Sequence, residues 1–158
     1  MEIKILTSEL KFDIKNKSHN EVSSIEDVNL RYMAEAGTEK ESEIDRCIIE
    51  AEARVRLVCG RFLKRVTAST PQNNALPESL PESYTYEFVD NPRRLDNKEK
   101  AMADSIHFAI VNLALSKFYV SVSQTGLANT HDAMATNALS LIENALYDKL
   151  PPVQPTIN

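Results

Sequence analysis

The first apolar positions of the chain alternate with charged ones. In residues 9–17, ELKFDIKNK, the side chains of Leu10, Phe12 and Ile14 occupy every second position. A period of two is typical of a strand that is buried on one face, so we expect a short strand or extended arm here. Over residues 22–36 the apolar spacing becomes helical, and Gly37 follows as a residue that commonly ends a helix. A first, short helix is therefore predicted at 22–36.

A longer helix is predicted from residue 38 onward, through EIDRCIIEAEARVRLVCGRFL at 43–63. Thr38 and Glu41 have the spacing of a capping box, in which two side chains satisfy free amides at a helix start. The apolar residues then recur in steps of four and three: Ile44, Ile48, Ala51, Val55, Val58 and Phe62. This spacing predicts a helix that packs lengthwise against another helix.

The helical period is lost over residues 67–98, where four prolines stand among Ser, Thr and Asn. Within this excursion, YTYEFV at 84–89 places Tyr84, Tyr86 and Phe88 on one face, so we expect one strand or β-arm. Long excursions are commonly functional, and these aromatic side chains either contact a partner protein or cover the core of their own domain.

Two further helices are predicted after the excursion. Asp96 and Glu99 repeat the capping pattern and open a helix to about residue 123, which carries two apolar stripes: Met102, Ile106, Ala109, Leu113 and Val120, and Phe108, Val111, Leu115, Phe118 and Val122. A helix that is apolar on several sides belongs at the centre of a bundle. Gly126 and Asn129 are expected to form a turn, and Thr130 to cap a last helix that runs through Leu150. The buried face of that helix is predicted to hold Ala135, Ala138, Leu139, Ile142, Ala145 and Leu146.

These elements predict a mainly α protein, a four-helix bundle-like domain with one or two short β-strands or arms. The chain of 158 residues fits one domain at 1–150. Because Pro151 and Pro152 end the last helix, residues 151–158 are expected to be an extended C-terminal tail.

Charge narrows the classes of function. A net charge of −5 and a pI near 5.3 argue against a protein that coats nucleic acid, which needs clustered Lys and Arg. Three glycines, Gly37, Gly60 and Gly126, are too few for a glycine-rich phosphate loop. The N-terminus lacks the pattern of a signal peptide, and His107 and Asn112 interrupt the longest apolar segment. We therefore expect a cytoplasmic protein without a membrane span.

The charges of the helix at 38–63 are sorted by sign. Residues 39–52 hold six acids against two bases, whereas 53–66 hold five bases and no acid. Acids near the N-terminus and bases near the C-terminus interact favourably with the helix macrodipole, which is one explanation of the pattern. The other is a contact between subunits, in which the acidic end of one copy meets the basic end of a neighbour.

The candidate chemistry is sparse. Cys47 and Cys59 are twelve residues apart, about 18 Å along a helix, so they are expected to be reduced thiols. Cys47 is expected to be a small buried residue, and the arginines around Cys59 could lower its pKa. The closest approach to a metal motif is Asp104 with His107, which lacks the second acid–His pair that a bundle site needs. We therefore predict no catalytic residue, no metal, no cofactor and no enzymatic activity.

The order of these segments resembles the head-tail connector (adaptor) proteins of tailed bacteriophages. The resemblance covers residues 38–150: the helix EIDRCIIEAEARVRLVCGRFL, a proline-bearing excursion, the hydrophobic helix MADSIHFAIVNLALSKFYV and a short final helix. It implies a subunit of a homo-oligomeric ring, commonly a dodecamer, in the neck of the virion and made in the host cytoplasm. The implied partners are the portal protein and tail or neck proteins, while DNA passes through without sequence-specific binding.

The interface residues proposed from the sequence come from the long helix, the aromatic arm and the tail: Arg54, Arg61, Arg65, Tyr84, Tyr86, Phe88, Val153 and Ile157. Two other classes of function stay open. One is a small cytoplasmic helical adaptor or regulator of a bacterial cell, which would be a monomer or dimer. The other is a helical-bundle metalloenzyme that uses Asp104 and His107.

Overall fold

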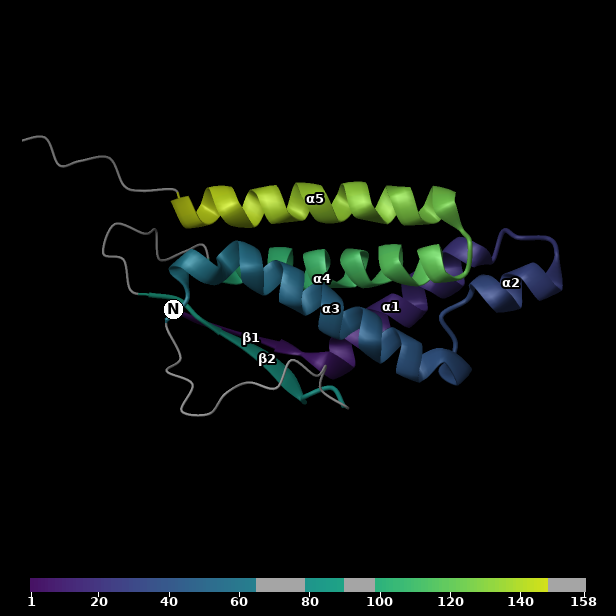
Figure 1. The fold of residues 1–158 in the computed structure, drawn as a ribbon, viewed down its shortest axis with the longest axis horizontal. Helices are drawn as coiled ribbons and strands as arrows, with labels where there is room; N and C mark the ends of the chain where they lie inside the picture. The colour runs from purple at the N-terminus through teal and green to yellow at the C-terminus, as the bar shows by residue number, and fades with distance from the viewer. Residues whose placement is uncertain (65–78, 90–98, 148–158) are drawn as a thin grey trace, which may run out of the picture.

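The computed structural model describes residues 1–64, 79–89 and 99–147. Its elements, in chain order, are β1 (Glu2–Leu6), α1 (Thr7–Val22), α2 (Val28–Ala34), the 3-10 turn η1 (Thr38–Lys40), α3 (Glu41–Cys59), the 3-10 turn η2 (Gly60–Phe62), β2 (Ser83–Glu87), α4 (Glu99–Ser121) and α5 (Thr125–Tyr147). The predicted fold class is confirmed: four long helices form a bundle, accompanied by a short two-stranded sheet (Figure 1). The predicted tail at 151–158 lies outside the described residues.

Helix α4 is the centre of the bundle, as its apolar stripes predicted. It packs against α5, α3, α1 and β1, and the run from Ala109 to Leu115 is buried on every side. Two of the stripe residues, Phe108 and Val120, are nevertheless exposed. The seam of α3 is also confirmed, because Ile44, Ile48, Ala51 and Val55 are buried while Val58 and Phe62 are partly buried against the core.

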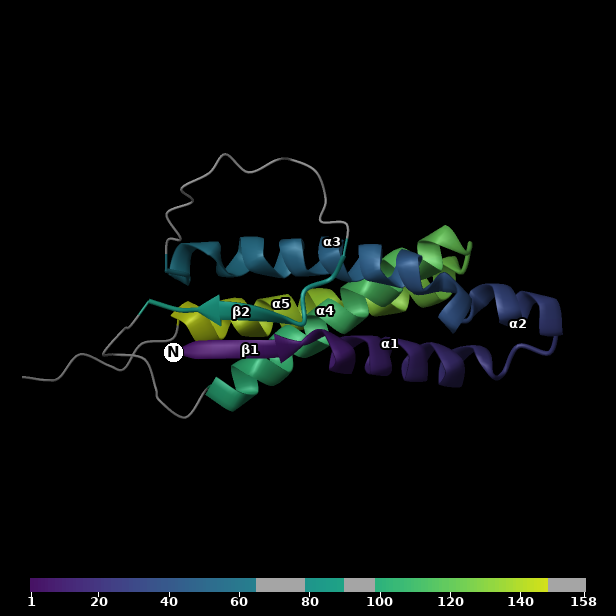
Figure 2. The ribbon, with the colours of Figure 1, turned by 90° about the horizontal axis from the view of Figure 1, so that it is seen from below.

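The two strands pair antiparallel, with Ile3 opposite Tyr86 and Ile5 opposite Tyr84. Beyond β2 the pairing continues as a bridge between Leu63 and Phe88, where the Val89 amide donates to the Phe62 carbonyl at 2.8 Å. Figure 2 shows β1 in line with α1, into which it leads, and β2 between β1 and the ribbon of α3. The strand expected at 84–89 is thus confirmed, and it links the N-terminus of the chain to the end of α3.

The strand expected at 9–17 is wrong, because these residues belong to helix α1. Leu10 and Ile14 fit a period of two as well as a period of four, and the continuation decides between them. Ser18 and Val22 extend the four-residue spacing and are buried, whereas Phe12 is 67% exposed. The strand lies one segment earlier, at β1, where Ile3 and Ile5 face the core.

The helix expected at 22–36 is shorter than predicted, because only 28–34 form it, as α2, and Val22 is the last residue of α1. Helix α1 ends at Val22, and α2 begins after Asp27, whose carboxylate accepts hydrogen bonds from the amides of Asn29 and Leu30. An aspartate at this position favours a new helix start because its side chain satisfies amides that lack partners in the first turn. The expected buried face does not form, since Ala34 is the only buried residue of α2.

Two predicted helix caps are also wrong, although the helix expected from residue 38 does begin there, as η1 followed by α3. Over residues 37–41 no side chain caps η1 or α3, so the capping box of Thr38 and Glu41 does not form. Helix α5 begins at Thr125, and the Thr130 hydroxyl donates to the Gly126 carbonyl inside the helix. The turn lies earlier, at Ser123, which has a φ of 60°. The cap predicted at Asp96 lies outside the described residues.

The inward packing of the second strand can be tested with Phe88. Its side chain is fully buried, so Phe88→Ala should lower the free energy of unfolding by about 3–5 kcal/mol through lost packing and a residual cavity. The neighbour Val89 is 49% exposed, and Val89→Ala should cost about 0.5 kcal/mol or less. Urea denaturation of both variants measures the difference. Equal losses would contradict the burial described here.

Candidate functional site

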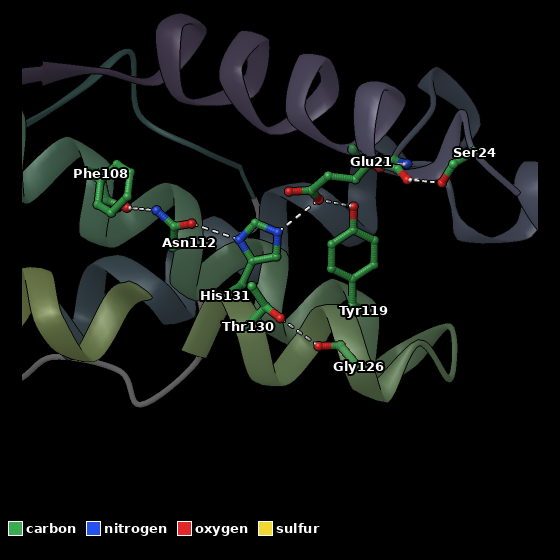
Figure 3. Close-up of polar contacts among 10 residues, drawn as sticks. Glu21, Ser24, Phe108, Asn112, Tyr119, Gly126, Thr130 and His131 are labelled. Atoms are coloured by element: carbon green, nitrogen blue, oxygen red, sulfur yellow. Dashed lines mark hydrogen bonds and ion pairs between the residues drawn. The ribbon is translucent and has the colours of Figure 1, made fainter. Parts of the chain in front are cut away.

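A buried polar network joins three helices at the α2 end of the bundle (Figure 3). At its centre His131 of α5 is 1% exposed. Its Nδ1 lies 2.7 Å from Oδ1 of Asn112 on α4, and its Nε2 lies 2.9 Å from Oε2 of Glu21 in the last turn of α1. The Tyr119 hydroxyl of α4 donates to the same glutamate oxygen at 2.7 Å. The network therefore connects α1, α4 and α5 through side chains alone.

The hydrogen positions in this network follow from its donors and acceptors. The Asn112 amide nitrogen donates to the Phe108 carbonyl at 2.7 Å, so its oxygen faces His131 and must accept a hydrogen from Nδ1. The other ring nitrogen, Nε2, faces the Glu21 oxygen at 2.9 Å. Burial raises the pKa of Tyr119, which keeps its hydroxyl protonated as a donor. Every polar group of His131 and Asn112 described here has a partner, as a stable buried network requires.

The network does not open into either described cavity. A cavity of about 630 Å³ lies between α4 and α5 and is lined by residues such as Met102 and Ile142. A second, of about 450 Å³, lies between α1 and α4 beside Phe12 and His107. Because neither cavity is lined by His131 or its partners, the network is suited to fixing the helices relative to one another.

Both thiols are inert by burial. Cys47 is buried beside the seam of α3, as expected, and burial raises its pKa to about 11. The expectation that arginines lower the pKa of Cys59 is wrong. Burial dominates there as well and raises its pKa to about 11, although Arg56 acts in the opposite direction. A buried, neutral thiol is a poor nucleophile, since the thiolate is the reactive form.

The histidine of the sequence-based metal motif is engaged across helices. His107 Nε2 lies 2.7 Å from Asp13 Oδ2 of α1. Asp104 lines the 450 Å³ cavity between α1 and α4 together with His107 and Asp13. Within residues 1–64, 79–89 and 99–147, no group of three or more His, Cys, Asp or Glu side chains has the arrangement of a metal site.

The aromatic arm faces inward. Tyr86 and Phe88 are fully buried and belong to the core, so the strand covers its own domain and these two residues cannot serve as an interface in this fold. Tyr84 is partly buried, and burial raises its pKa to about 12. A period of two predicted the shared face of these residues correctly, but it carries no information on whether that face meets the core or a partner.

The arginines proposed as interface residues are at the surface. Arg54 lies 3.5 Å from Asp132 of α5, with both side chains about half exposed, and Arg61 contacts the uncharged Tyr147 hydroxyl at 3.5 Å. The other three proposed interface residues, Arg65, Val153 and Ile157, lie outside the described residues.

The acidic half of α3 has partners within the chain. Lys11 of α1 lies 3.0 Å from Glu41 and 2.8 Å from Asp45, and Lys15 lies 3.7 Å from Glu41. The hydrogen bond from Lys11 lowers the pKa of Glu41. The sequence did not reveal these pairs because residues 9–17 were expected to form a strand, and a strand there gives no reason to place Lys11 and Lys15 beside the acids of the helix at 38–63.

The exposed apolar residues are the surface feature that the sequence did not predict. Of the thirteen large apolar side chains exposed in the described part of the chain, four lie on the seven-residue α2: Val28, Leu30, Tyr32 and Met33. Leu57 of α3 is the most exposed of all, at 81%. The exposure of Leu57 could have been predicted from the sequence, because Leu57 lies off the seam of α3. The exposure of the α2 residues could not, because their helical spacing in 22–36 is also that of a buried face.

The network can be tested by a double-mutant cycle. His131→Ala should lower the free energy of unfolding by about 2–4 kcal/mol, because Asn112 and Glu21 both lose a partner. Tyr119→Phe should cost about 1 kcal/mol. Combining Glu21→Ala with His131→Ala should give a coupling energy of about 1 kcal/mol in urea denaturation. Glu26→Ala, an exposed acid nearby, is the control, and strictly additive losses would show that the pair does not interact.

Thiol labelling tests the burial of the cysteines. The folded protein should react slowly with a thiol reagent until the pH approaches the pKa of about 11 of Cys47 and Cys59. In urea both thiols should react as ordinary cysteines with a pKa near about 8.5. Since the folded-state pKa is raised, folding loses stability as the pH rises through this interval. Rapid labelling of the folded protein at pH 8 would contradict the assignment.

No helix in the described segments is long and apolar enough to cross a membrane. A scan against models of protein families finds no match, and searches of curated proteins and of solved structures find none either. The function is therefore inferred from the residues and surfaces of this chain.

Proposed function

We propose that the protein is a structural subunit of the head-tail connector of a tailed bacteriophage. In this role copies of the chain form a ring between the capsid portal and the tail, and DNA passes through the ring without sequence-specific binding. The protein acts by holding partners in place and carries out no reaction. The proposal starts from the resemblance of residues 38–150 to connector proteins, and three features of the molecule support it.

The first supporting feature is a rigid helical body. The segments that carry the resemblance include α3, α4 and α5, and α4 is covered by the other helices and the sheet. The network around His131 and the pairs between Lys11 and the acids of α3 hold the helices to one another. A body fixed in this way suits a load-bearing ring, because its surfaces keep a constant geometry.

The second feature carries the most weight: apolar side chains gathered on an outer element. Single exposed apolar residues are normal on soluble proteins, but a continuous group of them marks a contact site. Val28, Leu30, Tyr32 and Met33 are all exposed on one seven-residue helix, which packs only lightly on the rest of the chain. A subunit that works only when assembled is expected to expose surface of this kind.

The third feature is the acidic balance of the chain, with a net charge of −5. Like charge on the wall of a channel keeps a passing duplex from adhering, because bound DNA requires clustered cations. This charge suits a passage for DNA better than a binding site for it.

The test is the native mass of the protein alone and mixed with portal protein from the same phage, measured by light scattering after size exclusion. We expect a ring-sized species or a portal-bound complex in the mixture, with a central channel in negative-stain images. A stable monomer or dimer that ignores the portal would contradict the proposal and would favour a cellular adaptor.

A further inference from the structure

The α2 surface consists of Val28, Leu30, Tyr32 and Met33, which are between 50% and 72% exposed. Helix α2 lies at one end of the long axis of the molecule (Figure 1). The Lys40 ammonium holds its C-terminal end by donating to the carbonyls of Tyr32 and Glu35 at 3.0 Å. The α2 surface is thus anchored from below while its apolar side chains point outward.

The surroundings of the α2 surface are acidic. Residues 26–40 contain four acids, Glu26, Asp27, Glu35 and Glu39, and two bases, Arg31 and Lys40, of which Lys40 donates to the carbonyls named above. The Arg31 side chain is turned inward, where Nε donates to the Ile25 carbonyl at 2.9 Å. The apolar group is therefore bordered mainly by carboxylates, which favours a partner with an apolar centre and a basic border.

A surface of that description exists on the same chain. The Leu57 surface consists of Arg54, Leu57, Arg61 and Lys64, which follow one another in steps of three and four and are all exposed at the end of α3. Residues 53–64 contain four bases and no acid. Gly60 and Ala53 are exposed beside Leu57, so backbone can approach closely there. Leu57 is thus an exposed apolar side chain with Arg54 on one side along the chain and Arg61 and Lys64 on the other.

The pairs that these cations make within the chain are weak. Arg54 is 3.5 Å from Asp132 and Lys64 is 3.9 Å from Glu87, with every one of these side chains about half exposed. Exposed pairs of this length contribute little to stability. Arg54, Arg61 and Lys64 can therefore turn to carboxylates of another molecule at little cost.

The two surfaces lie at opposite ends of the molecule. Helix α3 starts just after α2, at Glu41, and its 19 residues carry the chain about 28 Å toward the other end. Figures 1 and 2 both show α2 and the end of α3 at opposite ends of the long axis. The two surfaces of one molecule therefore cannot meet each other.

We propose that the α2 surface of one copy docks on the Leu57 surface of a second copy, so that the chain associates head to tail. Two α2 surfaces facing each other would oppose acid to acid, and two Leu57 surfaces would oppose base to base. Charges of opposite sign meet only when the α2 surface of one copy faces the Leu57 surface of another. Such a heterologous contact continues from copy to copy and closes a ring when the angle between copies permits. In the proposed connector ring this would be the contact between neighbouring subunits. Its role in a ring rests on the proposed function.

The test uses three neutral substitutions at similarly exposed apolar residues. Met33→Gln removes part of the α2 surface, Leu57→Gln removes the centre of the Leu57 surface, and Phe12→Gln on α1 is the matched control. Sedimentation velocity over a concentration series should show association of the wild-type chain and of Phe12→Gln. The two interface variants should associate at least tenfold more weakly, and added salt should weaken the wild-type association.

Mixing the two interface variants distinguishes head-to-tail association from a symmetric dimer. Each variant keeps one intact surface, and the intact surfaces are complementary. The mixture should therefore form a dimer of one Met33→Gln and one Leu57→Gln molecule and should stop there. A symmetric contact through one of the two surfaces would weaken only one of the variants, and mixing would not restore the association of that variant. Circular dichroism and thermal unfolding confirm that the variants remain folded.

The outcomes separate this inference from the proposed function. A wild-type chain that stays monomeric over the whole series, or variants that associate as well as the wild type, would overturn the head-to-tail contact. If Met33→Gln and Leu57→Gln still assemble fully on the portal, the connector function stands and the contact is wrong. If the chain associates head to tail but ignores the portal, the contact stands and the connector function is wrong.

Discussion

The burial of α4 is the constraint on which the rest of this structure depends. A helix that is apolar on every side is unstable unless other elements cover it completely, since water would otherwise meet its side chains. Helices α3 and α5 cover two of its sides, and α1 with the two-stranded sheet covers the remainder. Tyr86 and Phe88 are fully buried in the same core, where Arg56 of α3 lies 4.7 Å from the centroid of the Tyr86 ring.

Two of the buried polar residues in the described part of the chain, Asn112 and His131, pair with each other inside this core. Asn112 would be costly in the middle of α4 without partners, and it is satisfied by His131 and by the Phe108 carbonyl. Glu21 and Tyr119 complete the set from two further positions. Because such hydrogen bonds demand particular distances and directions, the network restricts how α1, α4 and α5 can pack, which apolar contacts alone would leave less defined.

The surface of the molecule contrasts with its closed core. The elements that cover α4 leave α2 projecting at one end, with apolar side chains on a border of carboxylates, while Leu57 stands among arginines near the other. Neither surface is required by the core, because α2 buries only Ala34 and Leu57 lies off the seam of α3. In the head-to-tail contact proposed above, these two surfaces meet, and the helical body between them sets the angle from one copy to the next.

The sequence by itself determined the central helix, the seam of α3 and the buried face of α5, because each is a periodic pattern that is several turns long. It also indicated the strand at 84–89 from three alternating aromatic positions. It could not place α1, since Leu10 and Ile14 satisfy two periods at once, and the buried Ser18 decided for the helix only within the tertiary packing. Nor could it find the network, whose members lie as far apart as Glu21 and His131 in the chain. Which way an apolar face points is likewise not a local property. Only the packing around α4 turned Phe88 inward and left Met33 and Leu57 exposed, because burial depends on which elements meet in space.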